Sequence, residues 1–422
     1  MTTTFRQRLP VEWTEKRLKF AAPLRNERVE ATSEHADYLG LENIESWTGK
    51  LIPTANGVHE PDEEATGGTA NSFRKDDVLF GKLRPYLAKS LHAHIDGVCT
   101  TELLVLKPCG ELYSRFLLYI ILSPEFVGQV DASTFGAKMP RANWDFVGSL
   151  KIPVPSLGLQ RLIADYLDRE TVRIDALVAE KQHMLALLEE KRAALISHAV
   201  TRGLNPSAPL KPSGLDWLGE IPAHWPTTKF SWSIFIIEGQ VDPEVEPYSS
   251  MVLVAPNHIE SKTGRLISYE TADDQGAMSG KYLCQRGDVI YSKIRPALRK
   301  AVLAPEDCIC SADMYPLRPQ DNLNAEYLLF FLLSEEFSTW AVLESDRVAM
   351  PKINRETLGA IRLPLPPLDE QVNIVDHIRK RITRIDTQRE AIENSVALLR
   401  ERRSALITAA VTGQLTMEEM NS

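Results

Sequence analysis

Two long stretches of the chain carry apolar side chains at seven-residue intervals, and each stretch follows a proline-rich segment. In the first stretch they are Leu167, Ile174, Leu188 and Leu195, and Leu177 and Met184 occupy the intermediate heptad position. Those of the second stretch are Ile378, Ile385, Ile392, Leu399 and Leu406. Both stretches lack proline and are rich in Leu, Ala, Glu and Arg, which favour helices. The pattern therefore predicts long helices over 157–204 and 368–415 that form a coiled coil.

Polar residues interrupt the predicted seam, which is the line of apolar side chains along which the helices of the coiled coil would pack. Lys181 breaks the first series, and Arg381, Gln388 and Ser395 occupy intermediate positions of the second. Because a simple two-helix zipper would be more apolar, the seam either pairs imperfectly or accepts further helices from a partner. The pattern leaves open whether the two helices pack on each other within one chain or pair between chains.

The segments that precede the two helices, 1–156 and 221–367, have short β-rich runs broken by Gly, Pro and Asp. Strands are expected over 78–80, 103–106, 289–291 and 302–303, and packed helices over 113–122 and 327–333. Each segment is therefore expected to form a compact α+β domain. The proline-rich segment 205–220 is expected to be a linker, and 416–422 a short tail.

The second half of the chain repeats the first at an offset near 211 residues. The clearest block aligns D-V-L-F-G-K-L-R-P-Y-L-A-K, from Asp77, with D-V-I-Y-S-K-I-R-P-A-L-R-K, from Asp288, and seven of the thirteen positions are identical. A repeat of this length indicates a duplicated domain–helix unit rather than a solenoid. The expected fold class is therefore α+β, with two tandem domains separated by two long antiparallel helices and an internal pseudo-two-fold repeat.

Composition limits the possible functions. With a net charge of −9 and a pI near 5.6, any DNA contact has to come from local Lys and Arg and from a partner. The five cysteines form no C-x-x-C pair and the nine histidines are scattered, so neither a disulfide framework nor a metal site is expected. The chain has no long apolar segment and no signal core, which predicts a cytoplasmic protein with no membrane contact. It has no N-P-P-[FYW] methyltransferase motif and no phosphate loop, which indicates that it is not itself an enzyme.

Several features together resemble the DNA-specificity subunits of type I restriction–modification systems. They are the domain–helix–domain–helix order, the K-[LI]-R-P segments at Lys82 and Lys293, and the P-x-P-x-x-x-x-Q leads into the helices, from Pro153 and Pro364. The linker S-G-L-D-W-L-G-E-I-P-A-H-W, from Ser213, is also similar to this family. The resemblance extends over nearly the whole chain.

The resemblance implies that each domain is a target-recognition domain that reads one half of a bipartite site in double-stranded DNA. It also implies that the helices dock two methyltransferase subunits, and that restriction/translocase subunits join them. S-adenosylmethionine, ATP and Mg²⁺ would be bound by these partners, and no cofactor by this chain. A helix of about 42 residues rises roughly 63 Å, which exceeds the roughly 34 Å of one DNA turn. The helices are therefore long enough to hold the two domains more than one DNA turn apart. A related type IIB-like modification system and a coiled-coil scaffold without DNA binding are the alternatives.

The candidate DNA-contacting residues are basic side chains in two duplicated segments, because Arg reads guanine edges and both Arg and Lys bind phosphate. They are Lys82, Arg84, Lys138, Arg141, Lys293, Arg295, Arg347 and Lys352. Within each K-[LI]-R-P segment, the two basic residues are expected to alternate on a strand and so to share one face. In the alternative interpretation, these residues brace the fold, and the Met-Pro loops, which contain Met139-Pro140 and Met350-Pro351, pack the domain against the root of the helix.

Overall fold

The computed structural model describes residues 9–30, 38–52, 68–136, 138–345 and 351–421. The chain divides into two compact units, and each consists of one globular domain and a part of each long helix. Unit 1 comprises residues 1–182 and 394–422, and unit 2 comprises residues 183–393. In the described residues, no helix is both long enough and apolar enough to cross a membrane.

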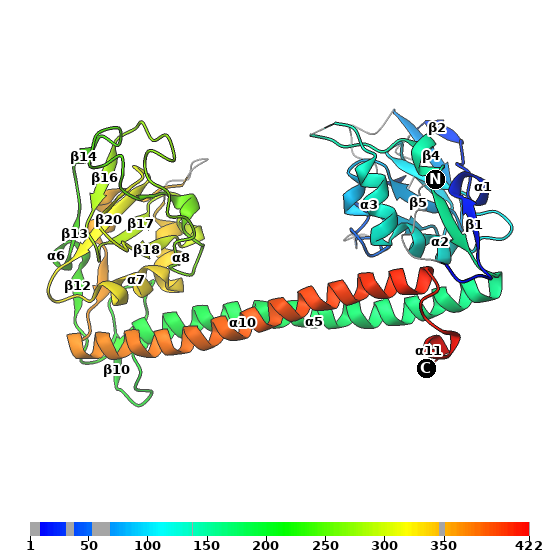
Figure 1. The fold of residues 1–422 in the computed structure, drawn as a ribbon. Helices are drawn as coiled ribbons and strands as arrows, with labels where there is room; N and C mark the ends of the chain where they lie inside the picture. The colour runs from blue at the N-terminus through cyan, green and yellow to red at the C-terminus, as the bar shows by residue number, and fades with distance from the viewer. Residues whose placement is uncertain (1–8, 31–37, 53–67, 137, 346–350, 422) are drawn as a thin grey trace. The chain divides into compact units, whose positions relative to one another are not determined.

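The two proline-free stretches form the predicted long helices, α5 (Leu157–Arg202) and α10 (Leu368–Val411), which pack against each other (Figure 1). In unit 2, Arg192 donates to Asp386 at 2.8 Å, and Arg389 lies 3.9 Å from Glu189. The earlier residue of α5, Glu189, thus contacts the later residue of α10, Arg389, so the two helices run antiparallel. The helices pack within one chain, which decides between the two alternatives that the sequence left open.

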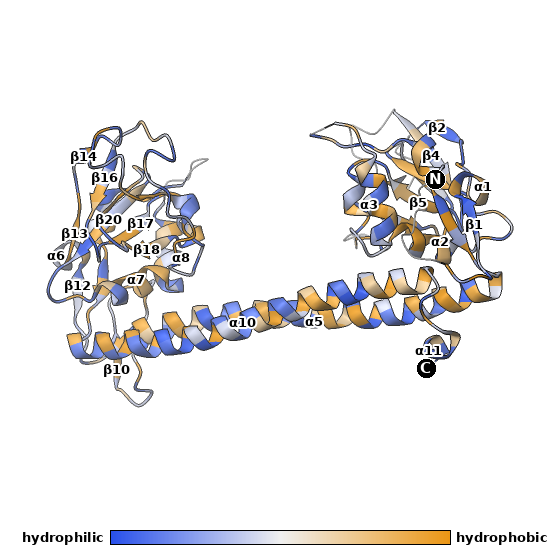
Figure 2. Cartoon of the chain, viewed as in Figure 1, coloured by the Kyte–Doolittle hydropathy of each residue, from blue (hydrophilic) through white to orange (hydrophobic). Residues whose placement is uncertain are grey.

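The predicted seam positions differ in burial along the helices. The buried positions are Leu167, Ile174, Ile378 and Ile385. The partly buried positions are Leu188, Leu195, Ile392, Leu399 and Leu406. Leu177 and Met184 remain 39% and 45% exposed. Figure 2 shows apolar and polar residues interleaved along both helices, so the pair retains apolar surface that no part of the described chain covers.

The described part of the globular domain of unit 1 contains a four-stranded sheet, a three-stranded sheet and a two-stranded antiparallel pair. Its strands are β1 (Thr14–Arg17), β2 (Arg28–Glu30), β3 (Tyr38–Leu39), β4 (Thr69–Phe73), β5 (Val78–Gly81), β6 (Ser90–His92), β7 (Gly97–Thr100), β8 (Leu103–Leu106) and β9 (Lys151–Val154). Its helices are α1 (Leu18–Ala21), α2 (Ser114–Ile121), α3 (Pro124–Ala132), α4 (Trp144–Val147) and the 3-10 turn η1 (Pro85–Leu87). The sheet orders are β2-β4-β7-β3 and β6-β5-β8, and the pair β1-β9 leads into α5.

Unit 2 repeats this arrangement. Its strands are β10 (Leu210–Pro212), β11 (Glu220–Pro222), β12 (Thr227–Lys229), β13 (Ile234–Ile236), β14 (Gln240–Val241), β15 (Leu253–Val254), β16 (Lys281–Cys284), β17 (Val289–Ser292), β18 (Ala301–Leu303), β19 (Cys308–Cys310), β20 (Met314–Pro319) and β21 (Arg362–Pro364). Its shorter helices are α6 (Phe230–Ser233), α7 (Ala325–Leu333), α8 (Glu335–Leu343), α9 (Arg355–Ala360) and the 3-10 turns η2 (Pro256–His258) and η3 (Pro296–Leu298). The sheet β14-β16-β19-β15 corresponds to β2-β4-β7-β3, and in both the last strand pairs in parallel.

In both units, the core of the domain continues into the long helices. In unit 1, Phe80 and Phe116 of the domain share one buried cluster with Ile163 of α5 and Ile407 of α10. In unit 2, the corresponding cluster joins aromatic residues of β17 and α7 to Ile196 of α5 and to the start of α10. Burial of these side chains fixes each domain on its own part of the helix pair.

The expected linker and tail are both folded. Segment 205–220 contains β10 and leads into β11, which form a hairpin. The ring of Trp217 lies 6.3 Å from Phe331 and 6.2 Å from Trp340, so the segment packs on the domain of unit 2. The tail forms α11 (Met417–Asn421), in which Met420 is buried and its carbonyl accepts a hydrogen bond from Arg169.

Candidate nucleic-acid interface

The K-L-R-P segment of unit 1 lies at the end of a buried strand. β5 ends at Gly81, so Lys82 follows the strand, and Arg84 adopts a left-handed conformation with φ 49°. Pro85 then begins η1. The expectation that Lys82 and Arg84 alternate on one strand face is therefore wrong. The chain turns at Arg84, and Pro85, whose fixed φ suits the first position of a helix, begins η1.

The same turn occurs in unit 2. β17 ends at Ser292, Lys293 follows it, and Arg295 has φ 49° before Pro296 begins η3. A left-handed conformation is unusual for a residue with a side chain. Its occurrence at both repeat-related arginines shows that this turn is common to the two repeated domains.

In unit 1, hydrogen bonds join this turn to the Met-Pro-Arg loop. The amide of Arg84 donates to the Pro140 carbonyl at 2.8 Å, and the amide of Ala142 donates to the Lys82 carbonyl at 2.8 Å. Between these two bonds, Leu83 and Arg141 form a β-bridge. The two segments that the sequence marked as basic are thus brought side by side.

Unit 2 has the corresponding bonds. The amide of Arg295 donates to the Pro351 carbonyl at 2.8 Å, and the amide of Ile353 donates to the Lys293 carbonyl at 2.9 Å. Ile294 and Lys352 form the bridge between them. The repeat in the sequence therefore extends to backbone pairing that places two basic side chains next to each other in each domain.

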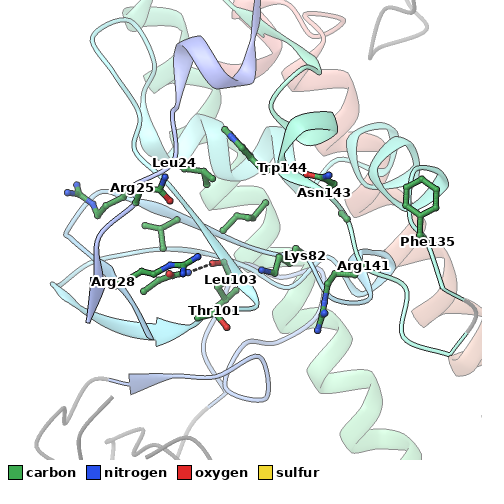
Figure 3. A pocket seen from close by; sticks show the side chains of 15 residues that line it. Leu24, Arg25, Arg28, Lys82, Thr101, Leu103, Phe135, Arg141, Asn143 and Trp144 are labelled. Carbon is green, nitrogen blue, oxygen red and sulfur yellow. Dashed lines mark hydrogen bonds between the residues drawn. The ribbon is translucent and has the colours of Figure 1, made fainter. Parts of the chain in front are cut away.

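A hollow of about 460 Å³ lies beside this pairing in unit 1. Lys82, Arg141 and Asn143 line it, and Arg28 and Asn71 line it from β2 and β4. Figure 3 shows Lys82 and Arg141 close together and Arg28 across the hollow from them. Most of the polar groups that face the hollow are cationic or amide donors, which suits phosphate oxygens and the acceptor edges of bases.

A carboxylate also reaches this region. Arg141 Nη2 lies 3.0 Å from Glu102 Oε1, so part of the charge of Arg141 is neutralised within the domain. Arg25, which also lines the hollow, donates to Asp77 through Nε at 2.6 Å. The hydrogen bond from Arg25 to Asp77 holds the pKa of Arg25 above its usual range. Arg25 therefore braces the domain, since its charge is committed to Asp77.

The repeat-related hollow in unit 2 is about 390 Å³ and is lined by Lys293, Lys352 and Asn354. Asp313 occupies the place of Glu102, and Tyr315 adds an aromatic wall. Lys293 Nζ lies 5.2 Å from the centre of the Tyr315 ring, within the range of a cation–π interaction. The two hollows thus share a lysine, a second cation and an asparagine, and differ in the other residues that line them.

The predicted basic residues fall into three groups. Four of them line the hollows: Lys82, Arg141, Lys293 and Lys352. Three are exposed but lie outside the hollow linings: Arg84, Lys138 and Arg295. Arg347 lies outside the described residues. Sequence reasoning missed Asn143 and Asn354, although both follow the Met-Pro motif at the same repeat position.

Two buried arginines connect the domains to the helices. In unit 1, Arg403 of α10 donates to Asp175 of α5 at 2.9 Å and to the carbonyls of Trp47 and Thr48 at 2.8 and 3.4 Å. Trp47 and Gly49 have positive φ values of 67° and 77°, which turn these carbonyls toward the helices. Arg403 therefore holds one loop of the domain against both helices.

Arg192 has the same position in unit 2. It donates to Asp386 at 2.8 Å and to the Thr263 carbonyl at 3.2 Å. Lys262 and Gly264 repeat the positive φ values of the turn in unit 1, at 67° and 76°. Burial lowers the pKa of Arg192, and its Nε has no hydrogen-bond partner in the described structure. Of the two arginines, Arg192 therefore makes the weaker connection between a domain and the helices.

Comparison with known proteins connects these features to one family. The family model of the type I restriction modification DNA specificity domain matches residues 259–397. The type I restriction enzyme EcoDI specificity subunit of Escherichia coli is 30% identical over 298 residues, which cover 67% of this chain and 66% of that protein. The match thus spans just under two thirds of the length of this relative.

Two solved structures share the fold. A chain from the structural study of "complex assembly and conformational transition of the type I R-M system" has a TM-score of 0.69 and 22% identity, with 97% of this chain and 100% of that chain covered. The HsdS subunit from Thermoanaerobacter tengcongensis has a TM-score of 0.53 and 21% identity, with 98% and 100% covered. At these identities the likeness concerns the fold alone.

Proposed function

Because this chain belongs to the family of type I restriction–modification DNA-specificity subunits, we propose that it reads a bipartite site in double-stranded DNA and docks methyltransferase subunits. Specificity subunits of this family are not catalytic, so the chemistry belongs to the partners. S-adenosylmethionine, ATP and Mg²⁺ would be bound by methyltransferase and restriction/translocase subunits.

One observation carries the DNA-reading part of this proposal. In each domain, a lysine after a buried strand and a cation of the Met-Pro loop line one hollow, and both are held by the same backbone bonds. Lys82 and Arg141 would contact one half-site, and Lys293 and Lys352 the other. The residues that differ, such as Arg28 in unit 1 and Tyr315 in unit 2, would let the two domains prefer different base sequences.

The long helices supply a fixed spacer in this proposal. A helix of 46 residues such as α5 is about 69 Å long at about 1.5 Å per residue. Each domain shares a buried core with its part of the helix pair, which supports transmission of the helix length to the DNA spacer. Two half-sites separated by more than one DNA turn of about 34 Å would then be read together.

Docking of two methyltransferase subunits is supported by the repeat and by exposed apolar positions on the helices, including Leu177 and Met184. A chain with an internal repeat presents related surfaces twice, which suits two copies of one partner. The restriction/translocase subunits would join the assembled complex. The acidic total charge of −9 agrees with DNA binding that depends partly on these partners.

The test is reconstitution with the methyltransferase subunit of the same host. We expect native mass spectrometry to show two methyltransferases with one copy of this chain. We also expect selection from randomised DNA to enrich two short motifs with one fixed spacing, with methylated adenine in each. No complex at micromolar concentration, or enrichment of one continuous motif, would refute the proposal.

A further inference from the structure

Phe135 holds an apolar ring in solvent at the rim of the unit 1 hollow. It is 82% exposed and belongs to the lining of the hollow. Figure 3 shows Phe135 beyond Arg141, on the far side of that residue from Arg28. Leu103 and Val105 also line the hollow, but both are buried. The apolar surface that a ligand would meet in this hollow therefore comes mainly from Phe135.

The backbone fixes the position of Phe135 relative to the basic residues. The amide of Arg141 donates to the Phe135 carbonyl at 3.3 Å, and these two residues form a β-bridge. Arg141 also forms the bridge to Leu83 of the K-L-R-P segment. Before Phe135, the hydroxyl of Thr134 donates at 2.7 Å to the carbonyl of Asp131 in the last turn of α3. Paired backbone therefore holds Phe135 on both sides, next to Arg141.

The neighbouring polar groups of the hollow present hydrogen-bond donors. Asn143 is exposed, and its Oδ1 accepts from the amide of Asp145 at 3.0 Å as the N-cap of α4. The side chain of Asn143 therefore offers its Nδ2 group to a ligand. The guanidinium of Arg141 carries only donors, and Glu102 contacts one of its nitrogen atoms. The ring of Phe135 thus lies in a lining whose exposed polar groups donate.

A donor beside an apolar ring matches one base edge in the major groove of DNA. Thymine presents the O4 acceptor together with the C5 methyl group. Guanine presents two acceptors and no methyl group, and adenine and cytosine present amino groups, which need an acceptor. A phosphate would be matched by Lys82 and Arg141 alone and would leave the ring of Phe135 without a contact. The chemistry of this lining therefore favours thymine.

The repeat keeps the donors and changes the apolar residue. The donors of the unit 1 hollow have the counterparts Lys293, Lys352 and Asn354 in unit 2. The counterpart of Phe135 in the sequence is Asp346, which lies outside the described residues. A carboxylate accepts hydrogen bonds and gives a methyl group no apolar cover. This position therefore differs in chemistry between the two domains, as residues that distinguish two half-sites should.

We propose that Phe135 is a specificity-determining residue, and that it selects a thymine in the half-site of unit 1 by covering the C5 methyl group of that base. The inference rests on the proposed function, since it assigns one base to a surface that is proposed to contact DNA. A donor of Asn143 or Arg141 binds O4 of the same thymine, and Lys82 contacts the DNA backbone. The domain of unit 2 makes no such selection at the corresponding position.

The experiment removes the methyl group and the ring separately and together. Duplexes carry the bipartite motif that the complex of this chain with its methyltransferase subunit selects. Each thymine of the motif is replaced in turn by deoxyuridine, which lacks only the C5 methyl group. Fluorescence anisotropy measures binding of each duplex to the wild-type complex and to the Phe135→Ala complex.

Phe20→Ala is the matched control. Phe20 is 70% exposed, belongs to the same domain and lies outside the lining of the hollow. Because Phe20 and Phe135 are both largely exposed, neither change should disturb the fold, which circular dichroism checks. An effect on thymine recognition that appears with Phe135→Ala and not with Phe20→Ala belongs to the ring in the hollow.

At one thymine, we expect deoxyuridine to weaken binding of the wild-type complex about 4-fold, the effect of covering one methyl-sized group. The Phe135→Ala complex should bind the thymine and deoxyuridine duplexes equally, because both changes remove the same contact. This thymine should lie in the half-site whose binding is weakened by Lys82→Ala with Arg141→Ala. Thymines of the other half-site should show no dependence on Phe135, and Phe20→Ala should retain the wild-type preference.

Additive effects of deoxyuridine and Phe135→Ala at every thymine would overturn the inference. Unchanged binding of all duplexes by Phe135→Ala would do the same, since the ring would then make no DNA contact. A loss of affinity that ignores the methyl group, with a rise in 2-aminopurine fluorescence in the wild-type complex, would assign the ring to insertion between bases instead. These three results leave the proposed function intact. Failure of the wild-type complex to select any bipartite duplex would overturn the proposed function, and this inference with it.

Discussion

Replacement of Arg403 by methionine tests how the domain of unit 1 is fixed to the helices. The side chain of Arg403 is 10% exposed, and it joins Asp175 to the carbonyls of Trp47 and Thr48. Arg403→Met removes all three hydrogen bonds and retains the length and packing of the side chain. The carbonyls and one carboxylate oxygen then lose their donor in a largely buried place.

The expected loss of unfolding free energy follows from these contacts. Removal of one partner of a buried ion pair costs about 3–5 kcal/mol of unfolding free energy. Asp175 is 22% exposed and also binds Lys50 at 2.6 Å, so its charge keeps a partner. We therefore expect Arg403→Met to lower the free energy of unfolding by about 2–4 kcal/mol. Arg192→Met should cost less, about 1–3 kcal/mol, because Arg192 makes two of these bonds and has an unpaired Nε.

Urea denaturation followed by circular dichroism measures the effect, with Arg402→Met as the matched control. Arg402 is the exposed neighbour of Arg403, and its replacement should change stability by no more than about 0.5 kcal/mol. The double variant Arg403→Met with Asp175→Asn should be less than additive, because both changes remove the same bond. Equal stability of the Arg403 and Arg402 variants would refute the conclusion that Arg403 holds the domain of unit 1 on the helices.

Three further predictions concern DNA contact, spacing and thiol reactivity. Lys82→Ala with Arg141→Ala should weaken binding of one half-site only and reduce the salt slope of binding by about 2, measured by fluorescence anisotropy; an unchanged slope would show that these residues only support the fold. Deletion of matched seven-residue blocks from both long helices should shorten the DNA spacer by about 10 Å, or roughly three base pairs, in methylation assays. An active variant with an unaltered spacer would refute the idea that helix length sets the distance between the two half-sites. At about pH 8, Cys109 should react with a thiol reagent before Cys99, because burial raises the pKa of Cys99 to about 12 and leaves it protonated; equal rates in the folded protein would contradict this burial.

The sequence predicts the features that depend on periodicity and repetition. The seven-residue pattern gave the two long helices, and the 211-residue offset gave two similar domains. The structure brings Lys82 and Arg141 together because one duplicated segment pairs with another through backbone bonds. A repeated sequence block cannot indicate that pairing by itself, although it marks the residues that take part.

Other features depend on contacts that no local pattern records. The turn at Arg84 was missed because the residues before Pro85 read as a continuing strand, whereas the backbone leaves the sheet at Gly81. The segment expected to be a linker packs on unit 2 through Trp217, whose partners lie more than a hundred residues away.

The central claim is that two domains of one chain read two parts of a DNA site at a fixed separation. Single-molecule methylome sequencing of the host, with and without this gene, tests it most directly. We expect one bipartite adenine-methylation motif with a single spacer length, which disappears when the gene is deleted. An unchanged methylome after deletion of the expressed gene would contradict it.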